Sequence, residues 1–222
     1  MNQKIGIIAT IDSYLMTMLI KKLFFNKFYD FEVLFDDKKK SEKDKAIWLD
    51  RTGGQLGNTI VNLNDLKNNN ISIFFFENHN SQDCVNFIKD ANYKFILNCG
   101  TPRKLSSEFL YASKMNVVNI HPGIIMQYRG SCSVEWAILN DDEVGNTSHF
   151  MTEVYDQGQI IFIEKYNLSF AKDYIDVRVH VFKKGIELMI KTVFYLIKKD
   201  ITELKLKLKL SEGGCVYKGI TD

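Results

Sequence analysis

Residues Val117 to Ile161 read VVNIHPGIIMQYRGSCSVEWAILNDDEVGNTSHFMTEVYDQGQII, and the interpretation of the whole chain starts from this stretch. An apolar run ends at Asn119, and His121 follows two residues later. Side chains alternate along a strand, so Asn119 and His121 are expected on the same side of it. After a helical pattern, a second strand delivers Asp156. The pattern therefore brings an amide, an imidazole and a carboxylate to the ends of neighbouring strands.

These three groups suit acyl transfer to an amine. A carbonyl under attack needs a donor for its developing oxyanion, a group that moves a proton near neutral pH, and a partner that holds the charge state of that group. Asn119, His121 and Asp156 can fill these roles in that order. The residues alone leave a second interpretation open, in which Asn119 and His121 satisfy backbone groups and Asp156 caps a turn.

The rest of the chain predicts an α/β protein with a Rossmann-like, doubly wound and mostly parallel sheet. Lys4 to Thr10 is nearly continuous in apolar residues, as in a strand buried on both faces. Asp12 or Ser13 can cap the helix that follows, and Phe31 to Phe35 gives a second strand, which completes an opening βαβ unit. Further strands are expected at residues 71–76, 94–99, 116–120, 145–154, 159–168 and 203–210, and helices at 79–93, 107–113 and 173–199. The charge run at 36–45 is expected to be a surface loop, followed by a helix and loop at 46–59, and 58–70 is expected to be a surface connection.

Length and composition narrow the class of protein. A chain of 222 residues fits one domain at residues 1–170, with a C-terminal helix and β extension at 171–222 packed on it. The net charge of +2 gives no overall basic face, so nucleic acid is not an expected partner. The first apolar run is too short for a signal peptide or a membrane span. The four cysteines form no C-x-x-C pair and no metal spacing with the four histidines, which indicates reduced thiols, a cytoplasmic protein and no metal.

Five short motifs follow one another between Val117 and Ile161: N-x-H-P-G, Y-R-G, W-A-I-x-N-D, G-x-T-x-H and D-x-G-x-I-I. This ordered set resembles the formyltransferases that use 10-formyltetrahydrofolate, and a looser resemblance runs from Lys4 to Leu196. The resemblance implies the formyltransferase fold, with 10-formyltetrahydrofolate as the co-substrate. It also implies Asn119, His121 and Asp156 as the catalytic trio, the same three residues that the chemistry selects.

The resemblance implies two further groups of site residues. The loop at residues 100–105 follows a strand of the sheet, where ligands collect in open α/β folds. In the resembling family this loop and the turn before Gly158 border the pterin ring. The cofactor-binding candidates are therefore Arg103, Lys104 and Leu105 with Val154, Tyr155 and Asp156, and the substrate-binding candidates are Tyr128 and Arg129. His149 is expected to be packed or hydrogen-bonded rather than catalytic.

The acceptor amine has to be chosen among the branches of that family. The loop Ala9 to Ser13 lacks the glycine of a phosphate-binding loop, which counts against glycinamide ribonucleotide. Methionyl-tRNA formyltransferases carry a further C-terminal domain, for which the residues after the long helix leave no room. The expected substrate is thus the amine of a nucleotide-linked amino-dideoxy sugar, such as dTDP-4-amino-4,6-dideoxyglucose, in O-antigen or other surface polysaccharide biosynthesis, and the resemblance suggests a homodimer. A phosphoribosylglycinamide formyltransferase, a formyltetrahydrofolate hydrolase and a non-enzymatic folate-binding module remain alternatives.

Overall fold

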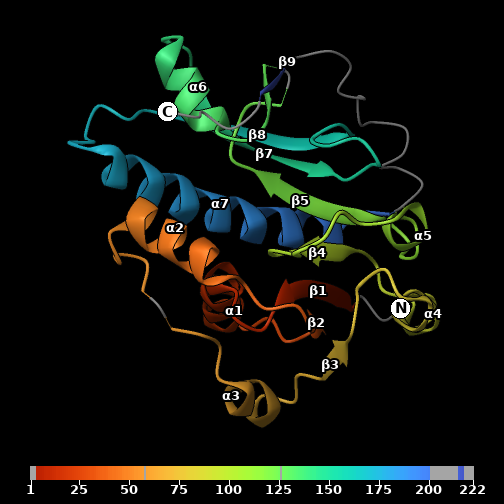
Figure 1. Ribbon diagram of the computed structural model, residues 1–222. Coiled ribbons are helices and arrows are strands. Elements are labelled where there is room, and N and C mark those ends of the chain that lie inside the picture. Colours follow the sequence, from red (N-terminus) through yellow and green to blue (C-terminus); the bar gives the residue numbers. More distant parts are fainter. Residues whose placement is uncertain (1–3, 58, 126, 201–214, 218–222) are drawn as a thin grey trace. The chain divides into compact units, whose positions relative to one another are not determined.

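The structure is a computed structural model that describes residues 4–57, 59–125, 127–200 and 215–217. Figure 1 shows its elements in chain order. They are β1 (Ile5–Thr10), α1 (Tyr14–Phe25), β2 (Phe31–Asp36), α2 (Glu42–Thr52), α3 (Leu63–Asn68), β3 (Ile73–Phe76), α4 (Gln82–Ala91), β4 (Ile96–Asn98), α5 (Ser107–Leu110), β5 (Val117–His121), β6 (Tyr128–Gly130), α6 (Ser133–Leu139), β7 (Val144–Phe150), β8 (Ile160–Tyr166), α7 (Tyr174–Ile197) and β9 (Cys215–Tyr217). The strand predicted at residues 203–210 lies outside the described ranges.

The main sheet has the strand order β3-β2-β1-β4-β5-β7-β8, and β6 pairs with β9 separately. Neighbours from β3 to β5 pair in parallel, whereas β7 and β8 are antiparallel. The predicted fold class, a mostly parallel α/β sheet, is confirmed. The chain divides into two compact units, Met1–Val118 and Asn119–Asp222, and β5 contains the boundary between them. The predicted division into a domain at residues 1–170 and a C-terminal helix and β extension at 171–222 packed on it stays a prediction.

The first unit is organised by β1 and β2, in which every residue is buried. Ser13 caps α1, since its hydroxyl accepts a hydrogen bond from the Met16 N–H and donates to the Cys99 carbonyl oxygen at 2.9 Å. Asp12 instead accepts the backbone N–H of Lys40 at 2.9 Å. The cap thus ties the start of α1 to the segment that follows β4.

Two expectations for the surface of this unit are wrong. The end of the charge run is helical rather than a loop, because Ser41 and Asp44 form a capping box that starts α2. The expected connection at residues 58–70 contains α3, which Asn62 caps by accepting the Asn64 N–H. Short capping motifs therefore began helices where charge and asparagine content had indicated loops.

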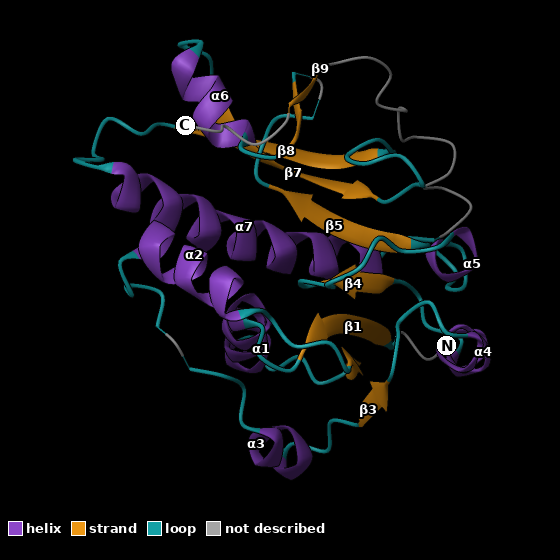
Figure 2. Cartoon of the chain, viewed as in Figure 1, coloured by secondary structure: helices purple, strands orange, loops and turns teal. Residues whose placement is uncertain are grey.

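In the second unit, α7 packs against β7 and β8. All seven residues of β7 are buried although four of them are polar. Asn146 donates to the Val181 carbonyl oxygen of α7 at 3.0 Å, and Thr147 donates to the Gly123 carbonyl oxygen at 2.6 Å. Figure 2 distinguishes these strands and the helix from the loops. The polar side chains of β7 therefore link the strand to the helix and to the turn after β5.

Among the helices of the described ranges, none is both long enough and apolar enough to cross a bilayer.

The turn between β7 and β8 should tolerate no side chain at Gly158. A Cβ there would lie 2.0 Å from the Phe150 carbonyl oxygen, so Gly158→Ala must displace backbone and should lower the free energy of unfolding by about 2 kcal/mol or more. Gly185 of α7 is the control, because a Cβ there meets only ordinary contacts at 3.6 Å and 3.9 Å. Gly185→Ala should be neutral or stabilise by up to about 1 kcal/mol, since alanine is the better helix former. Urea unfolding checks both, and equal stability of the two variants would contradict the prediction.

Candidate active site

All three residues of the predicted trio lie in the second unit. Asn119 and His121 are on β5, and Asp156 is in the turn between β7 and β8. The structure brings His121 Nδ1 to 3.3 Å from Asp156 Oδ1. Asp156 has a φ of 49°, a left-handed conformation that aspartate tolerates better than most residues. The tight turn thus turns the carboxylate toward the imidazole.

The imidazole of His121 is enclosed on both sides. Only 4% of the residue is exposed, and its Nε2 lies 3.0 Å from the Tyr128 carbonyl oxygen and 3.0 Å from Ser133 Oγ. Gly123 permits this packing, because a Cβ there would lie 2.7 Å from His121 Nε2 and 2.7 Å from Ser133 Cβ. Each ring nitrogen therefore faces an oxygen that can accept its hydrogen.

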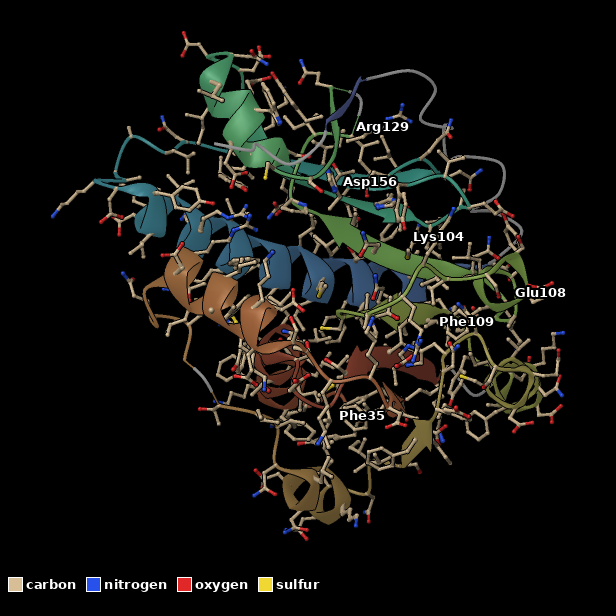
Figure 3. All side chains as sticks on the ribbon, viewed as in Figure 1. Phe35, Lys104, Glu108, Phe109, Arg129 and Asp156 are labelled. Carbon is tan, nitrogen blue, oxygen red and sulfur yellow. The ribbon has the colours of Figure 1, made fainter. Side chains whose placement is uncertain are left out.

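Asp156 is held as a carboxylate. Burial by itself would raise its pKa, but the hydrogen bond and charge of His121 and the Gly130 N–H outweigh burial, so the pKa lies below its usual value. The Gly130 N–H donates to Asp156 Oδ2 at 2.8 Å. Arg129, which precedes Gly130, is labelled with Asp156 in Figure 3. Both carboxylate oxygens are thus placed by the protein.

Sequence reasoning underestimated the part that His149 plays in the site. It is buried and hydrogen-bonded, as predicted, but one of its partners belongs to the trio: its Nε2 lies 3.3 Å from Asn119 Nδ2. Its Nδ1 lies 3.0 Å from the Phe150 carbonyl oxygen, which can only accept, so Nδ1 carries the hydrogen. Burial, aided by the charge of His121, lowers the pKa of His149 to about 4 although Asp156 opposes the shift. At neutral pH, Nε2 of His149 therefore has a free lone pair and accepts a hydrogen bond from the Asn119 amide.

This contact orients the carboxamide of Asn119. The Asn119 nitrogen faces His149, and Asp156 Oδ1 lies 4.0 Å from the same His149 nitrogen. The only hint of this contact in the sequence is that His149 is the last residue of the G-x-T-x-H motif. This motif lies on β7, whose polar residues are all buried. An alternating strand pattern does not reveal that both faces of β7 are covered.

The cofactor candidates of the first unit lie on the loop after β4. Arg103 donates through Nε to Asp36 Oδ2 at 2.8 Å and through Nη2 to the Glu77 carbonyl oxygen at 3.2 Å. Burial would raise the pKa of Asp36, but the bond from Arg103 and the backbone N–H groups of His79 and Lys38 lower it overall. The guanidinium therefore anchors its own loop to the ends of β2 and β3.

The other two residues of this loop differ in exposure. Leu105 is buried, and Lys104, labelled in Figure 3, is exposed while its carbonyl oxygen accepts from Asn80 Nδ2 at 2.8 Å. The loop backbone is thus held in place within its unit. Contact of Arg103, Lys104 and Leu105 with a cofactor stays a prediction.

The remaining candidates divide into exposed and buried residues. Val154 and Tyr155 are 53% and 60% exposed on the turn that carries Asp156. Tyr128 packs in a hydrophobic cluster, donates its hydroxyl hydrogen to Asp142 and accepts from Asn140 Nδ2 at 2.9 Å. Arg129 is also buried. Tyr128 thus has a packing role in the structure, and substrate contact by Tyr128 or Arg129 stays a prediction.

In the described part of the chain, no group of three or more histidine, cysteine, aspartate or glutamate side chains is placed to hold a metal ion.

A formyl transferase family model matches residues 51–193, which is more than half of the chain. The chain belongs to the formyl transferase family. A sugar N-formyltransferase from Shewanella sp. FDAARGOS_354 superposes with a TM-score of 0.65 at 18% identity, covering 97% of this chain and 76% of that one. A sugar 3N-formyl transferase solved in the presence of dTDP and 5-N-formyl-THF gives a TM-score of 0.59 at 17% identity, with 100% and 72% covered.

Other members of the family match as well. Phosphoribosylglycinamide formyltransferase from Bacillus halodurans gives a TM-score of 0.63 at 17% identity, covering 88% of this chain and 96% of that one. Methionyl-tRNA formyltransferase of Clostridium tetani is 27% identical over 127 residues, which are 57% of this chain and 41% of that protein. The chain thus spans less than half the length of this curated relative. These structural likenesses show the fold and leave the acceptor open.

The neutral, buried His149 should make stability depend on pH. Its pKa is about 4 in the folded protein, whereas an unperturbed histidine has a pKa of 6.5. Between these pH values, the unfolded chain therefore binds a proton at His149 that the folded chain does not bind. The free energy of unfolding should therefore fall as the pH drops from 6.5 to 4, by about 3 kcal/mol from this residue. Urea unfolding between these pH values should show a shallower pH dependence for His149→Asn than for the parent protein.

His180 provides the matched control for this measurement. It is only partly buried, and its pKa is lowered by burial and by Lys184. His180→Asn should leave most of the pH dependence in place. A His149→Asn variant with the slope of the parent protein would show that His149 is not held neutral.

Proposed function

We propose that the chain transfers a formyl group from 10-formyltetrahydrofolate to the amine of a nucleotide-linked amino-dideoxy sugar, for surface polysaccharide biosynthesis. The observation that carries the proposal is the pair of the buried His121 and the partly buried Asp156, with Nδ1 and Oδ1 3.3 Å apart, on the unit that also holds Asn119. An N-formyltransferase needs these three groups and no metal. The dTDP-4-amino-4,6-dideoxyglucose class is the expected acceptor, in a cytoplasmic and dimeric enzyme.

We assign a role to each member of the trio, and its contacts support that role. Asn119 Nδ2 carries two hydrogens, one directed to His149, and we assign the other to the oxyanion that forms when the amine attacks the formyl carbon. His121 has a partner at both nitrogens, so we assign it the positive charge that stabilises Asp156 and the adjacent transition state. Asp156, a carboxylate at neutral pH, accepts the amine proton directly or through water. Collapse of the oxyanion then breaks the bond between the formyl carbon and the folate nitrogen, and tetrahydrofolate leaves with that proton.

The start of α1 supports a sugar amine over glycinamide ribonucleotide. Ser13 caps α1 by accepting the Met16 N–H, and the buried carboxylate of Asp12 lies next to it in sequence. A phosphate group prefers a helix N-terminus that is free of side-chain caps and negative charge. The dTDP and 5-N-formyl-THF of the similar sugar 3N-formyl transferase support the same choice of ligands.

A second candidate acceptor is methionyl-tRNA. Two curated relatives that match this chain in sequence are methionyl-tRNA formyltransferases, at 27% and 28% identity. A tRNA acceptor therefore belongs in the test beside the sugars and the purine precursor.

Mass spectrometry of products tests the proposal. The protein is mixed with 10-formyltetrahydrofolate and, separately, with dTDP-3-amino sugars, dTDP-4-amino sugars, glycinamide ribonucleotide and methionyl-tRNA. We expect a formyl mass gain on one amino sugar. A gain on glycinamide ribonucleotide or methionyl-tRNA alone would assign the chain to that branch, and folate consumption with no formylated amine would indicate a hydrolase. Folate binding without turnover would indicate a non-enzymatic folate-binding module.

Variants of the trio should separate catalysis from folding. Asn119→Ala removes the proposed oxyanion donor and should lower kcat by about a hundred- to a thousand-fold. Asp156→Asn keeps the shape of the side chain but removes its charge, and should lower kcat by a similar factor. Asn167→Ala, an exposed asparagine of the same unit, should leave kcat unchanged. Full activity of Asn119→Ala would exclude the proposed mechanism.

A further inference from the structure

Ser133 is the first residue of α6 and is buried, with 2% of its surface exposed. Two left-handed residues precede it: Gly130 has a φ of 87° and Cys132 a φ of 57°. A left-handed cysteine is uncommon, and such strained positions persist where the surrounding structure fixes them. This turn carries the Ser133 hydroxyl to 3.0 Å from His121 Nε2.

The hydroxyl completes a closed circuit of hydrogen bonds. Asp156 Oδ1 contacts His121 Nδ1, and His121 Nε2 contacts Ser133 Oγ. Ser133 in turn donates to the Gly130 carbonyl oxygen at 3.1 Å, and the Gly130 N–H donates to Asp156 Oδ2 at 2.8 Å. Each group of the circuit fixes the next. We infer that Ser133 is a positioning residue, which sets the orientation of the His121 imidazole for the formyl transfer proposed above.

The same three residues, Ser133, His121 and Asp156, have the connectivity of a nucleophilic triad. Two observations show that these residues are not arranged as a nucleophilic triad. The hydroxyl hydrogen of Ser133 is given to the Gly130 carbonyl oxygen, so Oγ receives a hydrogen from His121 instead of giving one. The Tyr128 carbonyl oxygen, also 3.0 Å from His121 Nε2, can only accept, which requires the hydrogen to be on the ring. Burial also keeps an acyl donor away from Ser133.

The circuit predicts which kinetic constant depends on Ser133. Without the hydroxyl, the ring keeps the Tyr128 carbonyl oxygen as its partner at Nε2, so the fold should persist while the ring orientation loosens. An imidazole that is turned away from Asp156 stabilises the transition state less and has little effect on ground-state binding. The inference rests on the proposed function only for this kinetic consequence.

The first test is nitrogen NMR on protein labelled with ¹⁵N-histidine, which contains four histidines. In the unmodified protein, His121 Nε2 should have the shift of a protonated nitrogen, with its hydrogen protected from exchange. Ser133→Ala should change that shift and speed the exchange, whereas Ser131→Ala, an exposed serine of the same turn, should not. An Nε2 without hydrogen in the unmodified protein would overturn the inference without any variant.

Kinetics give the second test, once the acceptor amine is known. Ser133→Ala should lower kcat about tenfold and change KM less than about twofold, since one hydrogen bond to a charged ring is lost. Unchanged kcat with an unchanged ring signal would overturn the inference, as would a covalent formyl adduct on Ser133 in the mass spectrum of the intact protein. If the NMR signal depends on Ser133 but no amine is formylated, the positioning role of Ser133 is supported. The proposed function is then contradicted.

Discussion

The pairing of His121 with Asp156 is the interaction on which the organisation of the second unit depends. Taking a carboxylate out of water is costly, and attraction to a neighbouring charge offsets that cost only if the remaining lone pairs are also satisfied. Asp156 meets this condition through His121 Nδ1 on one oxygen and the Gly130 N–H on the other. One partly buried carboxylate therefore links the turn after β7 to the turn before α6.

The polar residues of β7 also position groups of the site through hydrogen bonds. Thr147 bonds to the carbonyl oxygen of Gly123, and Gly123 packs directly against the ring of His121. His149, held neutral by burial, accepts from Asn119 and lies within 4.0 Å of Asp156. A cationic His149 would compete with His121 for Asp156 and would turn the Asn119 nitrogen away. The buried environment of β7 thus keeps one imidazole uncharged beside another whose two nitrogens both face acceptors.

The fold and the pairing of His121 with Asp156 could be predicted from sequence because both depend on local patterns. The apolar run of β1 specifies a strand buried on both faces, and the spacing of Asn119 and His121 specifies a shared side. The Ser133 and His149 contacts depend instead on turns with left-handed residues, such as Cys132 and Asp156, and on the covering of β7 by other elements. Arg103 illustrates the same limit. The resemblance placed Arg103 beside the cofactor, and nothing in the sequence indicated that it also pairs with Asp36, a residue distant in sequence.

The start of α1 bears on the choice of acceptor in the proposed function. A helix N-terminus attracts an anion when its N–H groups are unpaired and its first residues leave room for the anion. Here Ser13 accepts from the Met16 N–H, and its hydroxyl hydrogen goes to the Cys99 carbonyl oxygen, so one N–H group of this N-terminus already has a partner within the protein. The Asp12 carboxylate accepts the Lys40 N–H through one oxygen, while its other oxygen is buried with no hydrogen-bond partner in the described structure. A phosphate placed at this N-terminus would meet the Asp12 carboxylate in a poorly solvated position, which is why we propose an amino sugar rather than a ribonucleotide monophosphate as the acceptor.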